Sequence, residues 1–476
     1  MVGRRIEQER LLDYYASGKS ELVAVYGRRR VGKTYLIRET FGDGFFFSYT
    51  GSAQIASTAG HLERFSVALG AYGLDGGGEA PPKTWMEAFD RLRNAIETAG
   101  GNHRKVIFVD EMPWLDRRGS GFLAAFDYFW NAFASARRDI LFIVCGSATS
   151  WITKKLFQSR GGLHNRVTGR IYLRPFTLQE CEAFLAAKGS GYARYDLIEC
   201  YMVFGGIPYY LDFIEKKYSL AVNIDHMVFA EGAPLANEFE ELYASLFEHH
   251  ERYTEVVAAL ASKMKGLTRE EIVAQTSHEN GGNLTSILAD LELSGFVRRY
   301  DAYPHKKNGS IYQLIDHFSL FWFAFLHDRR PTSPRYWSMM RSTPRLNAWR
   351  GYAFEIVCLR HIDQIEQGLG ISGVITYVSA WRSRKSDPGA QIDLVIERGD
   401  RVCNLCELKY AQAEYEITKE YAENLRRKEA AFLAETKTRR TLFTTMVTTY
   451  GVKRNMHSGI VRAEVAMDAL FLPPIA

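Results

Sequence analysis

Eight consecutive residues near the N-terminus have the types and the spacing that bind the phosphate groups of a nucleotide. The glycines of such a loop let backbone N–H groups curl around a β-phosphate. The lysine places a positive charge between the β- and γ-phosphates, and the threonine offers its hydroxyl to Mg²⁺. An apolar, strand-like run precedes the loop and a helical pattern follows it, which is the context that this chemistry requires. The sequence therefore predicts binding of ATP and Mg²⁺ at Gly27, Arg28, Arg29, Arg30, Val31, Gly32, Lys33 and Thr34.

Two acidic residues at the end of a later apolar run could supply the groups for ATP hydrolysis that the phosphate-binding loop does not contain. The strand-like residues 106–109 are followed directly by Asp110 and Glu111. We expect Asp110 to hold Mg²⁺ through water, and Glu111 to polarise the attacking water, the role that distinguishes hydrolysis from binding alone. Ser147 ends the next apolar strand. It is either a residue that orients the γ-phosphate or part of a turn that only ends the strand.

Arginines near these motifs fall into two groups. The three consecutive arginines of the loop are tolerated because those positions can face solvent. Arg160, Arg166 and Arg170 follow Ser147. One of these three is a candidate to face the γ-phosphate, from the same chain or from a neighbouring subunit of a homo-oligomer. The sequence does not choose among the three arginines, and it does not decide whether a homo-oligomer forms.

A second group of charged residues lies towards the C-terminus. Glu355 falls on a predicted helix, and Asp393 and Glu407 fall on two strand-like runs that can form a hairpin. Two carboxylates can hold Mg²⁺, which prefers oxygen ligands and retains several waters. Lys409 shares a strand face with Glu407 and can activate a water or stabilise charge on a phosphate. These four residues are predicted to form a catalytic site, with Asp393 and Glu407 as metal ligands; the alternatives are an inactive site and a surface of salt bridges.

The spacing of apolar residues predicts the helices and strands that must position the nucleotide site. Over residues 1–175, short apolar runs alternate with helical patterns, which predicts an α/β core with a parallel sheet covered by helices. Residues 176–240 are predicted to form a helical lid, in which Gly205-Gly206-Ile207-Pro208 interrupts the helical pattern. The strands predicted for the core are 22–26, 45–49, 105–109, 140–145 and 171–173.

Residues 241–318 differ in character from the core. Three helical patterns are followed by two strand-like runs around a polar loop, an order typical of a winged helix-turn-helix. The helices are expected at 253–264, 268–275 and 284–293, and the hairpin strands at 297–300 and 311–314. The basic residues of the hairpin are the candidates for contact with DNA phosphates: Arg298, Arg299, His305, Lys306 and Lys307.

The last part of the chain carries the second candidate site. A connector over residues 319–345 leads into residues 346–476, which are predicted to open with a helix at 350–365. Strands are expected at 374–378, 391–396 and 402–409.

The order of the N-terminal motifs resembles the archaeal-type ATPase family of the AAA+/STAND group. The resemblance covers residues 1 to about 240 and implies a P-loop ATPase core, a helical lid and nucleotide-dependent movement of the domains that follow. It also implies that Pro208, in a Gly-x-Pro motif, lies against the bound adenine. The motifs that carry it are the loop, Gly3-Arg4 with Glu7 and Leu11, Asp110-Glu111, Gly146-Ser147, Leu173-x-Pro175-Phe176 and Gly206-Ile207-Pro208.

The ordered set of a helix Glu, a strand Asp and a strand Glu-x-Lys resembles the PD-(D/E)xK nuclease fold, although no proline precedes Asp393. An ATPase core joined to a winged helix and to such a domain is similar to the family carrying the DUF234 domain. The resemblance implies an α/β, restriction-endonuclease-like domain over residues 346–476. The predicted function is an ATPase coupled to a DNA-directed, metal-dependent nuclease-like domain. The alternative is a STAND-type regulatory switch, or a DNA-binding protein, with an inactive nuclease fold.

The composition limits the class of protein. Hydrophobic residues make up 46% of the 476 residues and charged residues 24%, as in ordinary soluble proteins, and the net charge of +5 permits nucleic-acid binding without arguing for it. The six cysteines are scattered and suggest no disulfide framework. Because we find no signal-peptide pattern and no apolar run of membrane-spanning length, the sequence predicts a cytoplasmic protein without a membrane partner.

Overall fold

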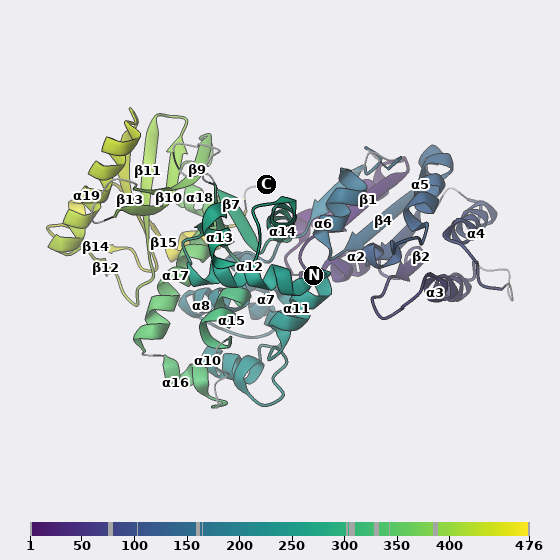
Figure 1. Cartoon of the computed structure of the whole chain (residues 1–476), viewed down its shortest axis with the longest axis horizontal. Helices are drawn as coiled ribbons and strands as arrows, with labels where there is room; N and C mark the ends of the chain where they lie inside the picture. The colour runs from purple at the N-terminus through teal and green to yellow at the C-terminus, as the bar shows by residue number, and fades with distance from the viewer. Residues whose placement is uncertain are drawn as a thin grey trace. The chain divides into compact units, whose positions relative to one another are not determined.

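A parallel sheet of five strands, in the order β2-β3-β4-β1-β5, forms the centre of the N-terminal unit, Met1–Arg174 (Figure 1). Strands β3 and β4 are buried along their whole length, as is typical of strands covered by helices on both faces. The elements are α1 (Arg5–Ala16), β1 (Glu21–Tyr26), α2 (Lys33–Phe41), β2 (Phe45–Thr50), α3 (Thr58–Ala71), α4 (Trp85–Thr98), β3 (Lys105–Asp110), α5 (Phe122–Ala132), β4 (Ile140–Gly146), α6 (Thr149–Ile152) and β5 (Gly169–Tyr172).

The second unit spans Pro175–Ala476. The computed structural model describes residues 2–74, 80–101, 103–158, 162–163, 165–300, 303, 310–327, 333–341, 343–383 and 389–474. Helices dominate the first part of the second unit and return after residue 316. They are α7 (Leu178–Ala187), α8 (Arg194–Phe204), α9 (Pro208–Asp212), α10 (Leu220–Ile224), α11 (Glu238–Leu246), α15 (His317–Phe325) and α16 (Tyr336–Met340).

Between these helices lies a helix–hairpin segment, the described residues of 250–314. Strand β8 pairs with β7 on one side and with β6 on the other, so the hairpin becomes a three-stranded antiparallel sheet. The three helices and the hairpin occur where the sequence predicts them. Their bounds are α12 (His250–Ser262), β6 (Leu267–Thr268), α13 (Arg269–Gln275), α14 (Gly282–Leu293), β7 (Val297–Tyr300) and β8 (Ile311–Leu314).

A mixed sheet in the order β15-β13-β11-β10-β9 ends the chain. Its first three strands in sequence pair antiparallel, whereas β11, β13 and β15 run parallel, and α19 makes the crossover from β11 to β13. The elements are α17 (Pro344–Arg360), α18 (Ile362–Gly368), β9 (Thr376–Arg382), β10 (Gln391–Arg398), β11 (Val402–Lys409), β12 (Tyr415–Glu416), α19 (Lys419–Thr436), β13 (Thr441–Thr448), β14 (Val452–Lys453) and β15 (Ala463–Ala466).

Several predicted elements differ from the observed ones in their bounds, and two of them lie in the last part of the chain. The helix expected at 350–365 is divided at His361, whose buried ring accepts a hydrogen bond from the Leu178 N–H at 3.0 Å and therefore holds this position against α7. The strand expected at 374–378 is β9, which begins two residues later and extends to Arg382. The chain divides into its two units after Arg174, and the domain boundaries expected from the sequence stay predictions.

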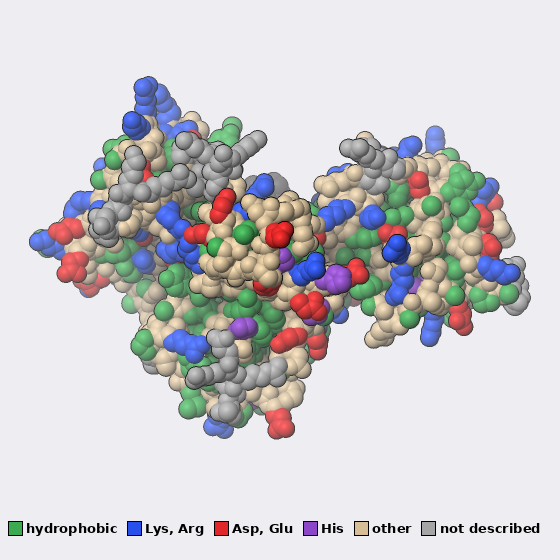
Figure 2. All heavy atoms as spheres, in the orientation of Figure 1, with side chains coloured by type: hydrophobic (Ala, Val, Ile, Leu, Met, Phe, Trp, Pro, Cys, Tyr) green, Lys and Arg blue, Asp and Glu red, His purple; other side chains and the backbone are tan. Residues whose placement is uncertain are grey.

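The surface and the helices give two further observations. Figure 2 shows basic and acidic side chains interspersed over the visible face of the molecule, in keeping with the small net charge. Within the described part of the chain, every helix is too short or too polar to cross a membrane.

Candidate functional site

The phosphate-binding loop leaves β1 and enters α2 at Lys33, so the predicted strand–loop–helix context is confirmed. Gly27 has φ +145°, and a Cβ there would lie 2.3 Å from the carbonyl oxygen of Leu173. Gly32 has φ +90°, in the region that favours glycine. The backbone of the loop therefore favours glycine at both of these positions.

The side chain of Lys33 is buried at the centre of the site. Its Nζ donates hydrogen bonds to the carbonyl oxygens of Gly27 at 3.0 Å and Arg28 at 2.9 Å, and to Ser147 Oγ at 3.1 Å. Burial lowers the pKa of the Lys33 ammonium below its ordinary value. A phosphate group beside it would favour the charged form, because an opposite charge stabilises an ion.

Thr34 and Asp110, the two residues predicted to hold Mg²⁺, are adjacent. Thr34 Oγ1 donates a hydrogen bond of 2.7 Å to Asp110 Oδ2. Burial raises the pKa of the Asp110 carboxyl, while the hydrogen bond from Thr34 acts in the opposite direction. A hydroxyl and a carboxylate oxygen are ligands that Mg²⁺ accepts, so the residues at this point fit the ion.

Ser147 binds the carboxylate of Glu111. Ser147 Oγ donates to Glu111 Oε1 at 2.6 Å, and the Ser147 backbone N–H donates to Glu111 Oε2 at 3.2 Å. Glu111 has φ +47°, an uncommon conformation for a residue with a side chain and one often found at functional sites. One hydroxyl thus contacts both the lysine of the loop and the acid that follows β3, so Ser147 does more than end a strand, and its predicted role of orienting the γ-phosphate stays a prediction.

Replacing Ser147 with alanine is expected to lower kcat for ATP hydrolysis by about tenfold, because hydrogen bonds to charged groups contribute about 1.5–3 kcal/mol. The KM for ATP should change little, since Lys33 keeps its acceptors on the loop. Steady-state phosphate release measures both quantities, with Ser150→Ala on α6 as the matched control. An unchanged kcat would show that Ser147 only ends the strand.

The arginines of the loop do not all face solvent, since Arg28 is buried. Arg29 and Arg30 are partly exposed. Arg160 lies outside the described residues. Of the other two candidates, Arg166 is exposed, and the guanidinium of Arg170 lies over the ring of Phe157, 4.3 Å from its centroid.

The Gly-Gly-Ile-Pro turn of the second unit is tightly packed. Gly206 has φ +69°, and a Cβ there would lie 2.2 Å from the carbonyl oxygen of Phe176. The Phe176 N–H donates to the Gly206 carbonyl at 2.7 Å, and Pro208 begins α9. The turn is therefore fixed in shape; that Pro208 contacts adenine stays a prediction.

The two C-terminal acids predicted to share a metal lie opposite each other. Leu394 pairs with Cys406, so the register of β10 and β11, continued by one residue, places Asp393 opposite Glu407. The register of β10 against β9 shifts between Ile392 and Val395, so Asp393 lies at an irregular point of its strand. Lys409, two residues further along β11, has its Nζ 5.3 Å from the centroid of the Tyr421 ring.

Lysines from outside these two strands bind both acids. Nζ of Lys265, in the turn between α12 and β6, lies 3.4 Å from Asp393 Oδ1. Lys428 on α19 forms an ion pair with Glu407, which also accepts a hydrogen bond from Tyr421 Oη at 3.2 Å. Two ammonium groups therefore balance the two carboxylates.

Glu355 on α17 belongs to the same electrostatic cluster. Burial, followed by the charge of Asp393, raises the pKa of the Glu355 carboxyl to about 8, against the opposing charges of Lys265 and Lys409. Over the described ranges, we find no group of three or more His, Cys, Asp or Glu side chains placed to hold a metal ion. Mg²⁺ is commonly held by one or two carboxylates and water, so a site formed by Asp393 and Glu407 stays a prediction.

The lysines and Tyr421 were not predicted from the sequence. Lys265 lies far from Asp393 in the sequence, and Lys428 is one of several basic residues along a helix. The one available signal was the position of Tyr421 and Lys428 on α19, the first helix after the Glu-x-Lys strand.

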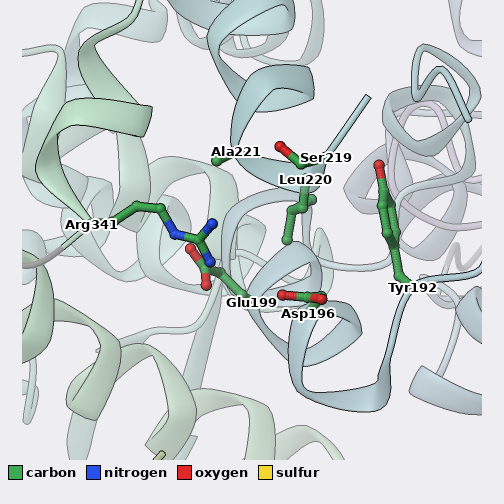
Figure 3. Close-up of a pocket in the computed structure, with 7 residues that line it drawn as sticks. All are labelled: Tyr192, Asp196, Glu199, Ser219, Leu220, Ala221 and Arg341. Carbon is green, nitrogen blue, oxygen red and sulfur yellow. The ribbon is translucent and has the colours of Figure 1, made fainter. Parts of the chain in front are cut away.

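A cavity of about 150 Å³ among the helices of the second unit is a further feature without a sequence signal (Figure 3). Asp196 and Glu199 reach it from α8, and Arg341 reaches it from the end of α16. Glu199 also forms a buried ion pair with Arg350, with an N–O distance of 2.9 Å. The residues come from separate parts of the chain, so no motif marks them.

Comparison with known proteins supports the prediction of an ATPase domain in the N-terminal part. Residues 1–214 match the model of an ATPase domain predominantly from Archaea. An uncharacterized protein of Methanocaldococcus jannaschii is 22% identical over 431 residues, which cover 90% of this chain and 91% of that protein.

Two solved structures are similar at low sequence identity. The Walker-type ATPase of Pyrococcus abyssi has a TM-score of 0.47 and 17% identity, covering 68% of this chain and 96% of that one. The ORC2 protein of Aeropyrum pernix has a TM-score of 0.43 and 16% identity, covering 68% of this chain and 92% of that one.

Proposed function

We propose that this chain hydrolyses ATP, and that its nucleotide state controls a DNA-directed, metal-dependent nuclease-like module at its C-terminal end. The proposal of ATP hydrolysis rests on two neighbouring groups of side chains. Lys33, Ser147 and Glu111 are joined by hydrogen bonds, and Thr34 is hydrogen-bonded to Asp110. These residues meet at the carboxyl ends of three neighbouring parallel strands, β3, β4 and β1. Ligands of α/β proteins bind at such ends.

Each side chain has one task in the proposed hydrolysis. Lys33 binds the phosphates, and Thr34 and Asp110 would hold Mg²⁺, which neutralises phosphate charge when bound. Glu111 takes a proton from water as the water oxygen bonds to the γ-phosphorus and the bond to the leaving ADP oxygen breaks. Ser147 orients the Glu111 carboxylate. The products are ADP and inorganic phosphate.

The helical part of residues 176–240 is proposed as the lid that senses the nucleotide. The packed turn at Gly206 gives Pro208 a fixed position at the start of α9. A proline held in this way can cover an adenine ring without loss of side-chain entropy. This contact rests on the resemblance to STAND ATPases.

The nuclease part rests on the placement of four residues. Asp393 and Glu407 are opposite each other on β10 and β11, and the charges of Glu355 and Lys409 act on the same cluster. The carboxylates would hold a divalent metal, and Lys409 would stabilise negative charge on the phosphate that is attacked.

The DNA partner is proposed for the helix–hairpin segment. Arg299 is exposed on β7 and free to approach a phosphate. Arg298, in contrast, donates from Nε to Gln313 Oε1 at 2.9 Å and lies over the Tyr300 ring, so its role is structural. The other predicted contacts, His305, Lys306 and Lys307, lie outside the described residues.

The second candidate function is a STAND-type switch with an inactive nuclease fold. One observation favours it: Asp393 and Glu407 each have an ammonium partner within the folded chain. In this case the module binds DNA or another partner, and ATP alone determines the state of the switch.

Metal-dependent cleavage separates the two functions. Asp393→Asn and Glu407→Gln are each expected to lower Mg²⁺- or Mn²⁺-dependent plasmid cleavage by more than about 100-fold while ATP hydrolysis is retained, because metal ligands are removed from a different unit. Asp400→Asn, an exposed acid that pairs with Arg398, is the matched control. Absence of cleavage by the parent protein, with and without ATP, would favour the switch. Cleavage that survives both substitutions would come from another site or another enzyme.

A further inference from the structure

The partner of Asp393 comes from a different part of the fold than the partner of Glu407. Lys428, which binds Glu407, is on α19 and belongs to the same C-terminal sheet and its helix. Lys265, which binds Asp393, belongs to the helix–hairpin segment. Only the second ion pair joins the acidic site to another segment.

Contacts around Lys265 hold its turn in place. Tyr300 Oη donates to the carbonyl oxygen of Lys265 at 3.1 Å. The guanidinium of Arg298 lies over the Tyr300 ring, 4.4 Å from its centroid. These contacts hold the backbone of Lys265 in place next to Asp393. A third of the surface of the Lys265 side chain is exposed.

The same segment is attached to the C-terminal sheet. The Tyr303 N–H donates to the carbonyl oxygen of Ala380 on β9 at 3.0 Å. The Tyr303 ring packs on Phe432 of α19, with a centroid distance of 5.0 Å. Besides the ion pair, Tyr303 thus attaches the segment to the sheet and its helix through both its backbone and its ring, which helps to hold Lys265 beside β10.

We infer that Lys265 is a built-in cation that blocks divalent-metal binding at Asp393, so that the helix–hairpin segment keeps the C-terminal acidic site closed. This inference rests on the proposed function of that site. A divalent ion at Asp393 would meet the positive charge of Lys265 at close range, and like charges repel most strongly where water is partly excluded. The lysine must therefore withdraw before the metal binds.

Direct metal binding tests this inference without any assay of activity. Mn²⁺ titrations of the full chain without nucleotide, followed by the EPR signal of free Mn²⁺, give the affinity. Lys265→Ala is expected to bind Mn²⁺ about tenfold more tightly than the parent protein. Lys263→Ala is the matched control, because Lys263 lies in the same turn but pairs with Glu271 at 2.6 Å, and its affinity should equal that of the parent.

A second substitution tests whether the tighter Mn²⁺ binding occurs at Asp393. Asp393→Asn in the Lys265→Ala background should abolish the added Mn²⁺ binding. Lys265→Gln keeps most of the side chain and removes only the charge, so it should reproduce the gain if Lys265→Ala fails to fold.

Each outcome has a distinct meaning. Equal, Asp393-dependent binding in the parent and in both Lys265 variants would overturn the blocking role and leave the proposed metal site intact. Absence of Asp393-dependent binding in every variant would overturn the metal site, and the blocking role with it. A gain shared by Lys263→Ala would show a general charge effect and would also overturn the inference.

Discussion

Replacing Lys33 with alanine is expected to weaken ATP binding by more than about 100-fold. Truncating one partner of a buried, charged hydrogen-bonded pair typically costs about 2–5 kcal/mol, and Lys33 Nζ is buried where the phosphates are expected. The substitution also removes the donor to two carbonyl oxygens of the loop and to Ser147. Isothermal titration with ATP and Mg²⁺ measures the affinity.

Lys155→Ala is the control for this experiment, since Lys155 is an exposed lysine of the same unit. Thermal unfolding without nucleotide should be compared for both variants, so that a loss of folding is not taken for a loss of binding. Parent-like affinity in a folded Lys33→Ala protein would remove the assignment of Lys33 to the phosphates.

Replacing Glu111 with glutamine is expected to preserve ATP binding and to lower kcat by about 10²–10⁴-fold, the usual contribution of a general base. The amide keeps the size of the side chain and an oxygen that can accept from Ser147, but it cannot take a proton from water. Single-turnover hydrolysis and ATP titration, made on the same sample, separate the two effects.

Glu39→Gln on α2 serves as the control, because Glu39 is an exposed acid near the loop. A Glu111→Gln protein that hydrolyses ATP at the parental rate would mean that another group activates the water. A variant that loses binding as well as hydrolysis would instead give Glu111 a structural role, as the partner of Ser147 that keeps the site assembled.

The phosphate site could be predicted because its chemistry is local. A strand, a loop of fixed spacing and a helix are contiguous, and the carboxyl ends of neighbouring parallel strands necessarily meet, which brings Asp110 and Ser147 to the loop. The burial of Arg28 could not be predicted, because the motif says nothing about which other segments cover the loop. The carbonyl of Leu173, against which Gly27 packs, comes from just beyond the last strand of the sheet.

At the C-terminal site, even less of the side-chain environment could be predicted from the local sequence. A hairpin places Asp393 opposite Glu407, and two strand-like runs with a short connection were enough to expect that. The ion pairs of Lys265 and Lys428 depend on how separate segments pack, and no local spacing encodes such packing. A motif therefore identifies the acids, whereas the fold determines which cations already neutralise them.

The position of β1 in its sheet has a consequence for the synthesis of the chain. Its two neighbours are β4 and β5, so residues 21–26 pair with residues 141–146 and 169–172. At the usual pace of translation, these partners leave the ribosome roughly ten seconds after β1. The strand that carries the phosphate loop is therefore the first to be made and among the last to be enclosed, and a nascent chain shorter than about 170 residues has no complete nucleotide site.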